Sequence, residues 1–223
     1  MKKVFALIAL LLPMTVMAQE GEKDTTIVIP QTENTLRLTA ELSKYGYANK
    51  DALSLIMAAR LSKQAGFTLE MREKENDEGT APSTQGGQKV GQISLDPQKL
   101  LDDAKAMAHD DGVLLALIDD VNNHVRGAVG TQQYASSTVD AGSSDVYRVN
   151  FTAGKLAVVT MVGDGDTDLD LYIYDPNGNL VDSDTGNSDN CVCAWTPRVS
   201  GKYKIKIVNR GIVYNSYILR TNQ

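Results

Sequence analysis

The C-terminal part of the sequence, residues 135–223, consists of short segments in which polar and apolar residues alternate. In GKYKIKIVN (201–209), lysines alternate with a tyrosine and two isoleucines, so one face of a strand would meet solvent and the other a core. Turn sequences such as Asp-Pro-Asn-Gly at 175–178 separate the segments. Many short strands at this spacing predict an antiparallel β-sandwich, with Trp195, the only tryptophan, in its core.

The sequence before this region has a helical period instead. Leucine and alanine recur at three- and four-residue spacing over residues 32–70 and again over 96–126. Asn49 and Asp96 are placed to cap the starts of helices, and Gly66 is placed to end one. Each of the two stretches predicts a helical hairpin, and the two hairpins together predict a small α bundle.

The stretch between the hairpins, residues 71–92, is first charged and then rich in glycine, serine, threonine, proline and glutamine. This composition is typical of a linker. The expected fold class is therefore α+β in two parts: a helical region at 32–126 that contains this linker, and a C-terminal antiparallel β-sandwich at 135–223. The two hairpins also share a short sequence match, and a true repeat is one interpretation of it.

The N-terminus predicts the compartment. Two lysines precede a mostly apolar run over residues 5–16, and Val16-Met17-Ala18 ends in the small residue typical of a cleavage site. We expect a cleavable signal peptide at 1–18, cut after Ala18, and a secreted or periplasmic protein. The run is shorter than the roughly 20 residues of a membrane span. No long apolar stretch follows it, so the sequence predicts no transmembrane segment in the mature chain.

Charge and motif content exclude several function classes. The net charge is −6, and cleavage would remove two lysines and no acid. An acidic protein repels phosphate backbones, which makes nucleic acid a poor partner. No G-x-S-x-G, H-E-x-x-H or P-loop pattern is present, and the two histidines, His109 and His124, lie in helical sequence among acids and amides. The residues therefore predict that the protein is not an enzyme.

Two longer stretches resemble a known family. They are DVYRVNFTAGKLAVVTMVGDGDTDLDLYIYDPNGNLV (145–181) and WTPRVSGKYKIKIVN (195–209). Over about residues 135–223 the chain resembles the bacterial pre-peptidase C-terminal (PPC) domain family. The resemblance implies a small β-sandwich attached to a secreted protein, often a protease, with a role in attachment, solubility or targeting. Some related domains bind calcium or polymers such as collagen. No catalytic domain is expected before the sandwich here, which departs from the usual protease setting.

The acidic stretch GDGDTDLDLYIYD (163–175) is the clearest candidate for a cation site. An EF-hand loop is not expected, because Leu169 stands where that loop needs glycine and Asp175 where it needs glutamate. A site at the rim of the sandwich fits better, since crowded carboxylates repel one another unless a cation or hydrogen-bond donors neutralise them. The predicted calcium ligands are Asp164, Asp166, Asp168 and Asp170, with Asp182, Asp184 and Asp189 as further contributors. The alternative is a solvated acidic loop that aids solubility.

The only cysteines are Cys191 and Cys193. On an extended strand their Cα atoms would lie about 6.6 Å apart, near the upper limit for a disulfide, and their side chains would not converge. A closed bond needs a bulge or a turn at this position. Free thiols and an intermolecular bridge are the other possibilities.

These features favour an exported, non-catalytic binding or adhesion protein whose partner is an extracellular polymer, a glycan or an envelope protein. Tyr172, Tyr174 and Tyr214 are expected to form an aromatic ligand-binding surface for sugar or peptide; packing across strands is the alternative. A second hypothesis is an envelope structural or assembly factor whose helical hairpins hold a partner protein. A third is a hydrolase that uses Asp168 and Asp170.

Overall fold

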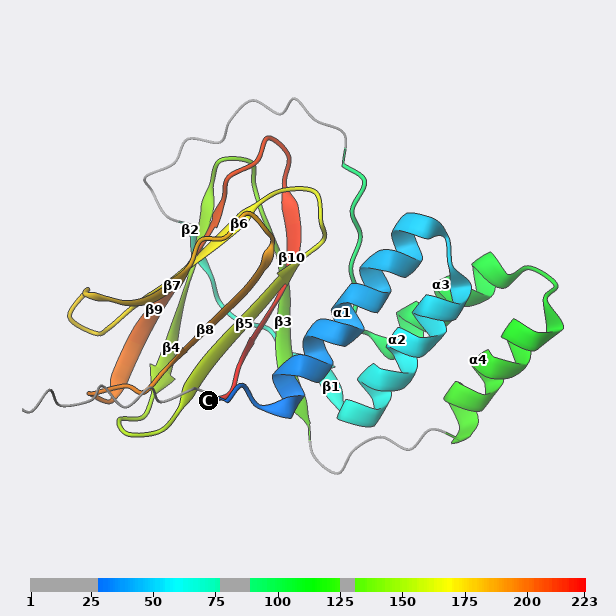
Figure 1. The fold of residues 1–223 in the computed structure, drawn as a ribbon, viewed down its shortest axis with the longest axis horizontal. Helices are drawn as coiled ribbons and strands as arrows, with labels where there is room; N and C mark the ends of the chain where they lie inside the picture. The colour runs from blue at the N-terminus through cyan, green and yellow to red at the C-terminus, as the bar shows by residue number, and fades with distance from the viewer. Residues whose placement is uncertain (1–27, 77–88, 125–130) are drawn as a thin grey trace, which may run out of the picture.

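The helices and the strands occupy opposite sides of the molecule (Figure 1). This computed structural model describes residues 28–76, 89–124 and 131–223. The helices are α1 Gln31–Asn49, α2 Ala52–Ala65, α3 Pro97–Ala108 and α4 Gly112–His124. The strands are β1 Phe67–Leu69, β2 Glu75–Asn76, β3 Gln132–Val139, β4 Ser144–Phe151, β5 Ala157–Gly163, β6 Leu169–Tyr174, β7 Leu180–Asp184, β8 Asn190–Trp195, β9 Gly201–Asn209 and β10 Asn215–Thr221. This order confirms the predicted α+β class. The predicted signal peptide and part of the predicted linker lie outside the described residues.

Capping residues place the ends of the helices. The sequence predicted Asn49 as an N-cap, and this is wrong. Asn49 is the last residue of α1, and the side chain of Asp51 accepts the backbone N–H of Leu53 at the start of α2 (3.1 Å). Asp51 takes this role because it directly precedes the free N–H groups of α2. Gly66, at φ 71°, ends α2 as expected, since glycine adopts the left-handed conformation without a steric penalty. Asp96 caps α3, also as expected.

The four helices, here called the helical unit, form the two predicted hairpins. α2 contacts α1, α3 and α4, and Gly46 lets α1 and α2 approach closely, because a Cβ at this position would lie 2.5 Å from Leu55 Cδ2. The core of the unit is built from small and branched apolar residues: Ala52, Leu55, Ile56, Ala58, Ala59, Leu100, Leu101, Ala104, Ala108, Ile118 and Val121. Within the described residues, no helix has both the length and the apolar character needed to cross a bilayer.

Two five-stranded sheets form the β-sandwich. Their strand orders are β1-β3-β10-β5-β8 and β2-β4-β9-β6-β7. Between the sheets, Trp195 is 8% exposed and packs edge-on against Phe151, with ring centroids 4.9 Å apart. Tyr203 completes an aromatic group at 5.7 Å from Trp195. The predicted burial of Trp195 is confirmed, and so is the alternation along β9, where Tyr203, Ile205 and Ile207 are buried.

The chain that leaves α2 adds an edge strand to each sheet. β1 pairs in parallel with β3, with Phe67 opposite Gln132. β2 pairs antiparallel with β4, and Lys74 beside it donates to the buried carboxylate of Asp145 (3.0 Å). Segment 67–76 therefore contributes a strand to both layers of the sandwich. Sequence analysis placed these residues in the helical region and its linker.

Helix α1 lies across the outer face of the first sheet (Figure 1). Leu36 and Ala40 of α1 pack in one cluster with Tyr134 of β3, Val162 of β5 and Ile218 of β10. All seven residues of β5 (AVVTMVG) are consequently buried. A continuous apolar run of this kind is typical of a strand that is covered on both faces.

An ion pair lies within this interface. Glu33 of α1 pairs with Arg220 of β10, and their side chains are 0% and 8% exposed. Arg220 also donates to Gln132 Oε1 (2.6 Å). Burial lowers the pKa of Arg220, because a low-dielectric environment disfavours its charge. The helical unit is thus joined to the sandwich by apolar packing and by a buried pair of opposite charges.

Both cysteines are free thiols on the buried face of β8. Cys191 donates to the carbonyl oxygen of Leu169 (3.1 Å). Burial raises the pKa of both thiols, so Cys191 and Cys193 stay in the unreactive thiol form at neutral pH.

Candidate functional site

Backbone N–H groups point at the acidic loop, the connection between β5 and β6 that carries three of the predicted calcium ligands. Asp164 is 3% exposed and accepts the N–H of Ser216 (2.6 Å). Asp166 accepts the N–H groups of Val90 (3.0 Å) and Gly91 (2.7 Å). Hydrogen bonds of this kind stabilise the ionised form of a carboxylate.

Two lysines add positive charge to the same place. Lys89 pairs with Asp164 and with Asp166, the latter at 2.8 Å. Lys44 of α1 pairs with Asp189 of the neighbouring β7–β8 loop (3.1 Å). Because Lys44 lies on α1 and Lys89 on the chain leading to α3, these acidic side chains hold two separate segments of the N-terminal half against the sandwich.

The pKa of Asp166 follows from these contacts. Its partial burial alone would raise the pKa, but hydrogen bonds from Lys89 and from the N–H groups of Gly91 and Val90 outweigh burial and lower the pKa from its ordinary value of 3.8. A carboxyl whose folded-state pKa is lowered stabilises the fold above its unfolded-state pKa, and this contribution is lost as the pH falls through the folded-state value. The contact between the acidic loop and residues 89–91 is therefore strongest at neutral pH.

The other two predicted ligands have different surroundings. Asp170 accepts from Arg210 Nε (2.6 Å) and from the hydroxyl of Tyr172 (3.0 Å). Asp168 Oδ1 is buried and has no hydrogen-bond partner among the described residues. The structure thus joins Asp164 and Asp166 through one lysine, while Asp170 is paired with an arginine at the side of β6.

Asp182 and Asp184 of β7 protect a sheet edge. Asp182 accepts the N–H of Ala194 (2.8 Å), and Asp184 accepts the N–H of Val192 (3.0 Å). Both N–H groups belong to β8, the last strand of its sheet. Capping these donors with carboxylates removes groups that would otherwise pair with another chain.

Calcium takes six to eight oxygen ligands, whereas the carboxylates of Asp164 and Asp166 receive N–H donors. Within residues 28–76, 89–124 and 131–223, no group of three or more His, Cys, Asp or Glu side chains could hold a metal ion. An ion at Asp164 and Asp166 would have to displace the ammonium group of Lys89. Calcium binding by the four predicted aspartates stays a prediction.

Replacing Lys89 with methionine tests this loop. Without the ammonium group, Asp164 and Asp166 repel each other, and we expect a loss of about 1.5–3 kcal/mol, the range for hydrogen bonds to charged groups. If calcium has access to the loop, millimolar calcium should raise the melting temperature of K89M more than that of the parent, since a ligand of the folded state stabilises it. Thermal melting in chelator and in calcium, with D166N added to K89M as the control, measures both effects. If calcium changes the melting temperature of none of these proteins, the acidic loop does not bind calcium.

The three tyrosines predicted to bind a ligand lie on β6 and on the loop that leads to β10. Tyr172 and Tyr174 lie on β6, where Tyr172 accepts from Arg210 (3.0 Å) and the ring of Tyr174 lies 4.2 Å from Lys204 Nζ. Tyr214 lies near the acidic loop, with its ring 4.9 Å from the lysine that neutralises that loop. Each tyrosine therefore contacts a basic side chain of its own chain, and their common aromatic surface stays a prediction.

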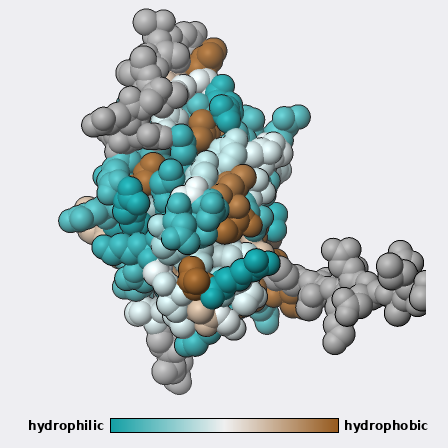
Figure 2. Space-filling model, turned by 90° about the vertical axis from the view of Figure 1, so that its left-hand side faces the viewer, coloured by the Kyte–Doolittle hydropathy of each residue, from teal (hydrophilic) through white to brown (hydrophobic). Residues whose placement is uncertain are grey.

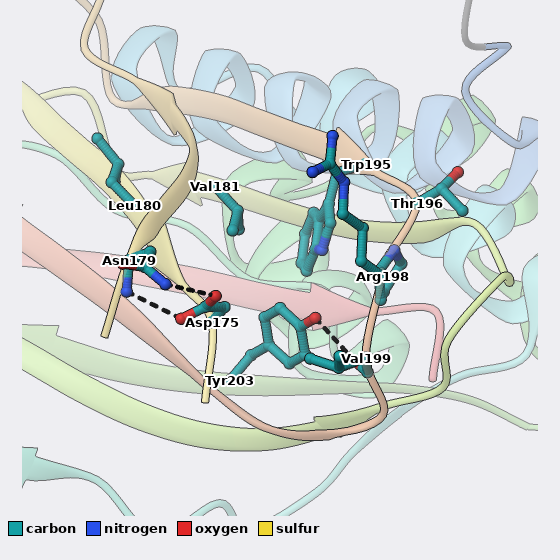
Figure 3. Close-up of a pocket in the computed structure, with 10 residues that line it drawn as sticks. Asp175, Asn179, Leu180, Val181, Trp195, Thr196, Arg198, Val199 and Tyr203 are labelled. Carbon is teal, nitrogen blue, oxygen red and sulfur yellow. Dashed lines mark hydrogen bonds between the residues drawn. The ribbon is translucent and has the colours of Figure 1, made fainter. Parts of the chain in front are cut away.

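A pocket of about 410 Å³ opens at the other end of β6, beside the turn to β7 (Figure 3). We call this end of the sandwich the distal end. Its lining includes Asp175, Leu180, Val181, Trp195, Arg198 and Val199. Sequence analysis missed this pocket. The available signal was the pair Leu180-Val181, because two adjacent apolar residues on a strand point to opposite faces and one of them is left outside the core.

A family model and several solved structures are similar to parts of this chain. Residues 143–208 match the family model of the bacterial pre-peptidase C-terminal domain. The chain is similar to the pre-peptidase C-terminal domain of a collagenase from Bacillus anthracis, with 13% identity over 42% of this chain and 91% of that chain and a TM-score of 0.37. It is also similar to PliG, a periplasmic inhibitor of g-type lysozyme from Aeromonas hydrophila, with 16% identity over 44% and 93% of the two chains and a TM-score of 0.32. A third similar structure is TmCBM61 in complex with β-1,4-galactotriose, with 18% identity over 40% and 68% and a TM-score of 0.30.

No curated protein matches the sequence. The family match itself runs from the start of β4 into β9, which includes the acidic loop and both walls of the distal pocket. The C-terminal β-sandwich of this chain is a pre-peptidase C-terminal (PPC)-like domain.

Proposed function

We propose that this chain is an exported, non-catalytic binding protein that attaches to an envelope or extracellular surface through the distal end of its PPC-like sandwich. The signal peptide expected at 1–18 supports export, and the family match over residues 143–208 supports a binding module rather than a catalytic one. Stabilisation of the acidic loop by calcium is a further part of this proposal, and the Lys89 variant tests it.

The observation that carries the proposal is the difference between the two ends of the sandwich. Lys44 and Lys89 bind the acidic end, whereas α1–α4 contribute no residue to the distal pocket. Around that pocket Leu180, Val181 and Val199 are 54%, 39% and 46% exposed. Figure 2 shows the molecule from the side opposite the helices, where hydrophobic residues form small, separate spots on a hydrophilic surface. Leu180, Val181 and Val199 lie together in the lining of one pocket, and apolar residues that line a pocket are typical of a ligand site.

A matched pair of variants tests this assignment. Val181→Asp places a charge in the distal pocket, and Ile212→Asp places the same charge on a 61%-exposed apolar residue of the β9–β10 loop, at the opposite end. We expect Val181→Asp to weaken retention of the full mature chain on washed envelope preparations about tenfold, which corresponds to about 1.4 kcal/mol. Ile212→Asp should bind like the parent. Equal retention of the parent and Val181→Asp would refute a distal attachment site.

A second candidate function is an assembly factor whose helical unit holds a partner protein. It is favoured by exposed apolar side chains on two helices: Leu53 and Met57 of α2 are 45% and 40% exposed, and Val113 and Leu117 of α4 are 71% and 36% exposed. The same retention measurement separates the two functions. Met57→Asp should abolish retention if the helical unit is the binding surface, and should leave it unchanged if the distal end is.

A further inference from the structure

Trp195 places an unpaired donor beside the distal pocket. The indole N–H can only donate, and Nε1 is buried without a hydrogen-bond partner among the described residues. The side chain as a whole is 8% exposed. Buried donors without an acceptor destabilise a protein, and a buried tryptophan N–H usually has a partner. A ligand that brings an acceptor to this pocket would satisfy the group.

Arg198 gives the same wall a positive charge. Its side chain extends alongside the pocket together with the indole of Trp195 (Figure 3). Across the described parts of the chain, no hydrogen bond or ion pair engages its guanidinium, which is exposed. Guanidinium and indole N–H groups are donors only. A carboxylate, which has two acceptor oxygens and a negative charge, is their natural complement.

The opposite wall of the pocket is apolar and negatively charged. Leu180 and Val181 are apolar, and the carboxylate of Asp175 is held by the backbone N–H groups of Asn177 (2.9 Å) and Asn179 (2.8 Å). The side-chain amide of Asn179 also donates to it and, with these N–H groups, lowers the pKa of Asp175, so the carboxyl stays ionised. This wall repels a second carboxylate and attracts N–H donors and aliphatic groups. A ligand that fits both walls carries a carboxylate at one side and N–H and aliphatic groups at the other.

The aromatic residues of the pocket argue for a peptide over a sugar. Sugar rings stack on open aromatic faces, but the two aromatic side chains in the lining, Trp195 and Tyr203, are 8% and 1% exposed. Both rings pack against each other and against the ring of Phe151. The exposed apolar surface of the pocket is aliphatic instead, and it fits the side chain of an aliphatic amino acid.

We propose that the distal pocket binds the carboxylate of a peptide, with Arg198 and Trp195 Nε1 donating to its oxygens and a neighbouring aliphatic side chain of the ligand against Leu180 and Val181. This inference names the ligand class of the proposed binding function and rests on it. Arg198 and Val181 are exposed, so they can shift as the ligand reaches the indole N–H. The carboxylate belongs either to the C-terminus of a chain or to an acidic side chain.

Fluorescence of Trp195, the only tryptophan, reports binding at the pocket. We would titrate the full mature chain with three acetylated peptides. The first ends in leucine and valine with a free carboxylate, the second is its carboxamide, and the third is a carboxamide with glutamate beside leucine. The first peptide should bind at least about tenfold more tightly than the second. Binding of the third shows that an acidic side chain suffices. Oligogalacturonate, an acidic sugar, is the fourth probe.

Substitutions assign the binding to the two donors. Arg198→Gln should weaken binding of the acid peptide about tenfold, and Lys202→Gln, which removes an exposed charge that does not line the pocket, should not. Trp195→Phe keeps the core ring and removes the N–H donor. Its binding is measured by calorimetry, and a melting curve shows that it folds. It should also lose about tenfold in affinity.

The following outcomes would contradict the peptide proposal or the attachment role. Equal binding of acid and carboxamide peptides, or unchanged binding by Arg198→Gln, would overturn it. Binding of oligogalacturonate without any peptide would replace the peptide by an acidic glycan. If Val181→Asp abolishes envelope retention while no peptide binds, the proposed function stands and this inference fails. If the acid peptide binds while Val181→Asp is retained like the parent, the pocket assignment stands and the attachment role fails.

Discussion

Replacing Glu33 with alanine should lower the free energy of unfolding by about 3–5 kcal/mol, the range for removing one partner of a buried ion pair. The side chains of Glu33 and Arg220 are 0% and 8% exposed, so the variant would leave a guanidinium buried with Gln132 as its remaining partner. For a chain of this size the loss corresponds to a melting temperature roughly 10 °C lower. Differential scanning calorimetry of the full mature chain gives both quantities.

Two further variants show whether the loss comes from the unpaired charge. Glu33→Met combined with Arg220→Met removes both charges, and we expect it to recover most of the stability, because well-packed apolar residues often replace a buried pair without loss. Arg37→Ala removes an exposed charge from the same helix and should change stability by less than about 0.5 kcal/mol. A Glu33→Ala variant as stable as Arg37→Ala would show that α1 does not bury this carboxylate against β10.

Local patterns in the sequence predict the strands well. The alternation in β9 has period two because its outer face meets solvent, and each side chain's environment follows from its position. In β5 the sequence pattern does not show which side chains face the core, because all seven residues are buried. The helix that covers the outer face of β5 comes from the other half of the chain. Segment 67–76 is similar: its strands are only three and two residues long, too short for a periodic signal. These two strands form because they pair with β3 and β4, and such pairing between distant segments cannot be read from the local sequence.

The contacts of the acidic loop also depend on residues that are distant in the sequence. Crowded carboxylates require a cation or hydrogen-bond donors, and this much follows from the sequence alone. The structure supplies donors from residues 89–91 and from Ser216, and charge from Lys44 and Lys89. These groups are distant from residues 164–166 in sequence, so no motif around the aspartates could identify them. The distal pocket was likewise hidden, because it forms only when the β6–β7 turn meets the β8–β9 loop.

Removing the helical unit should prevent the sandwich from folding stably. A fragment that begins at residue 131 contains every strand of the family match but lacks α1, β1 and β2. Burial of a side chain such as Leu36 or Phe67, which are 0% and 5% exposed, stabilises a fold by about 1.5–3 kcal/mol each. Loss of both, together with the unpaired Arg220, approaches the whole stability of a typical domain, about 5–15 kcal/mol. We expect the fragment to show no cooperative melting transition.

Near-ultraviolet circular dichroism measures this directly, because the aromatic group around Trp195 gives a signal only when it is fixed in the core. The signal should be absent from the fragment and should return when residues 28–124 are added as a separate chain. Leu36→Asp in the full chain should act like the truncation, whereas Leu38→Asp, on the same helix and 53% exposed, should not. A fragment that melts cooperatively near the temperature of the full chain would show that the sandwich is an independent domain. If the fragment fails as expected, the helical unit is part of the folding unit of this PPC-like domain, and the ligand of the distal pocket can be sought only with the full chain.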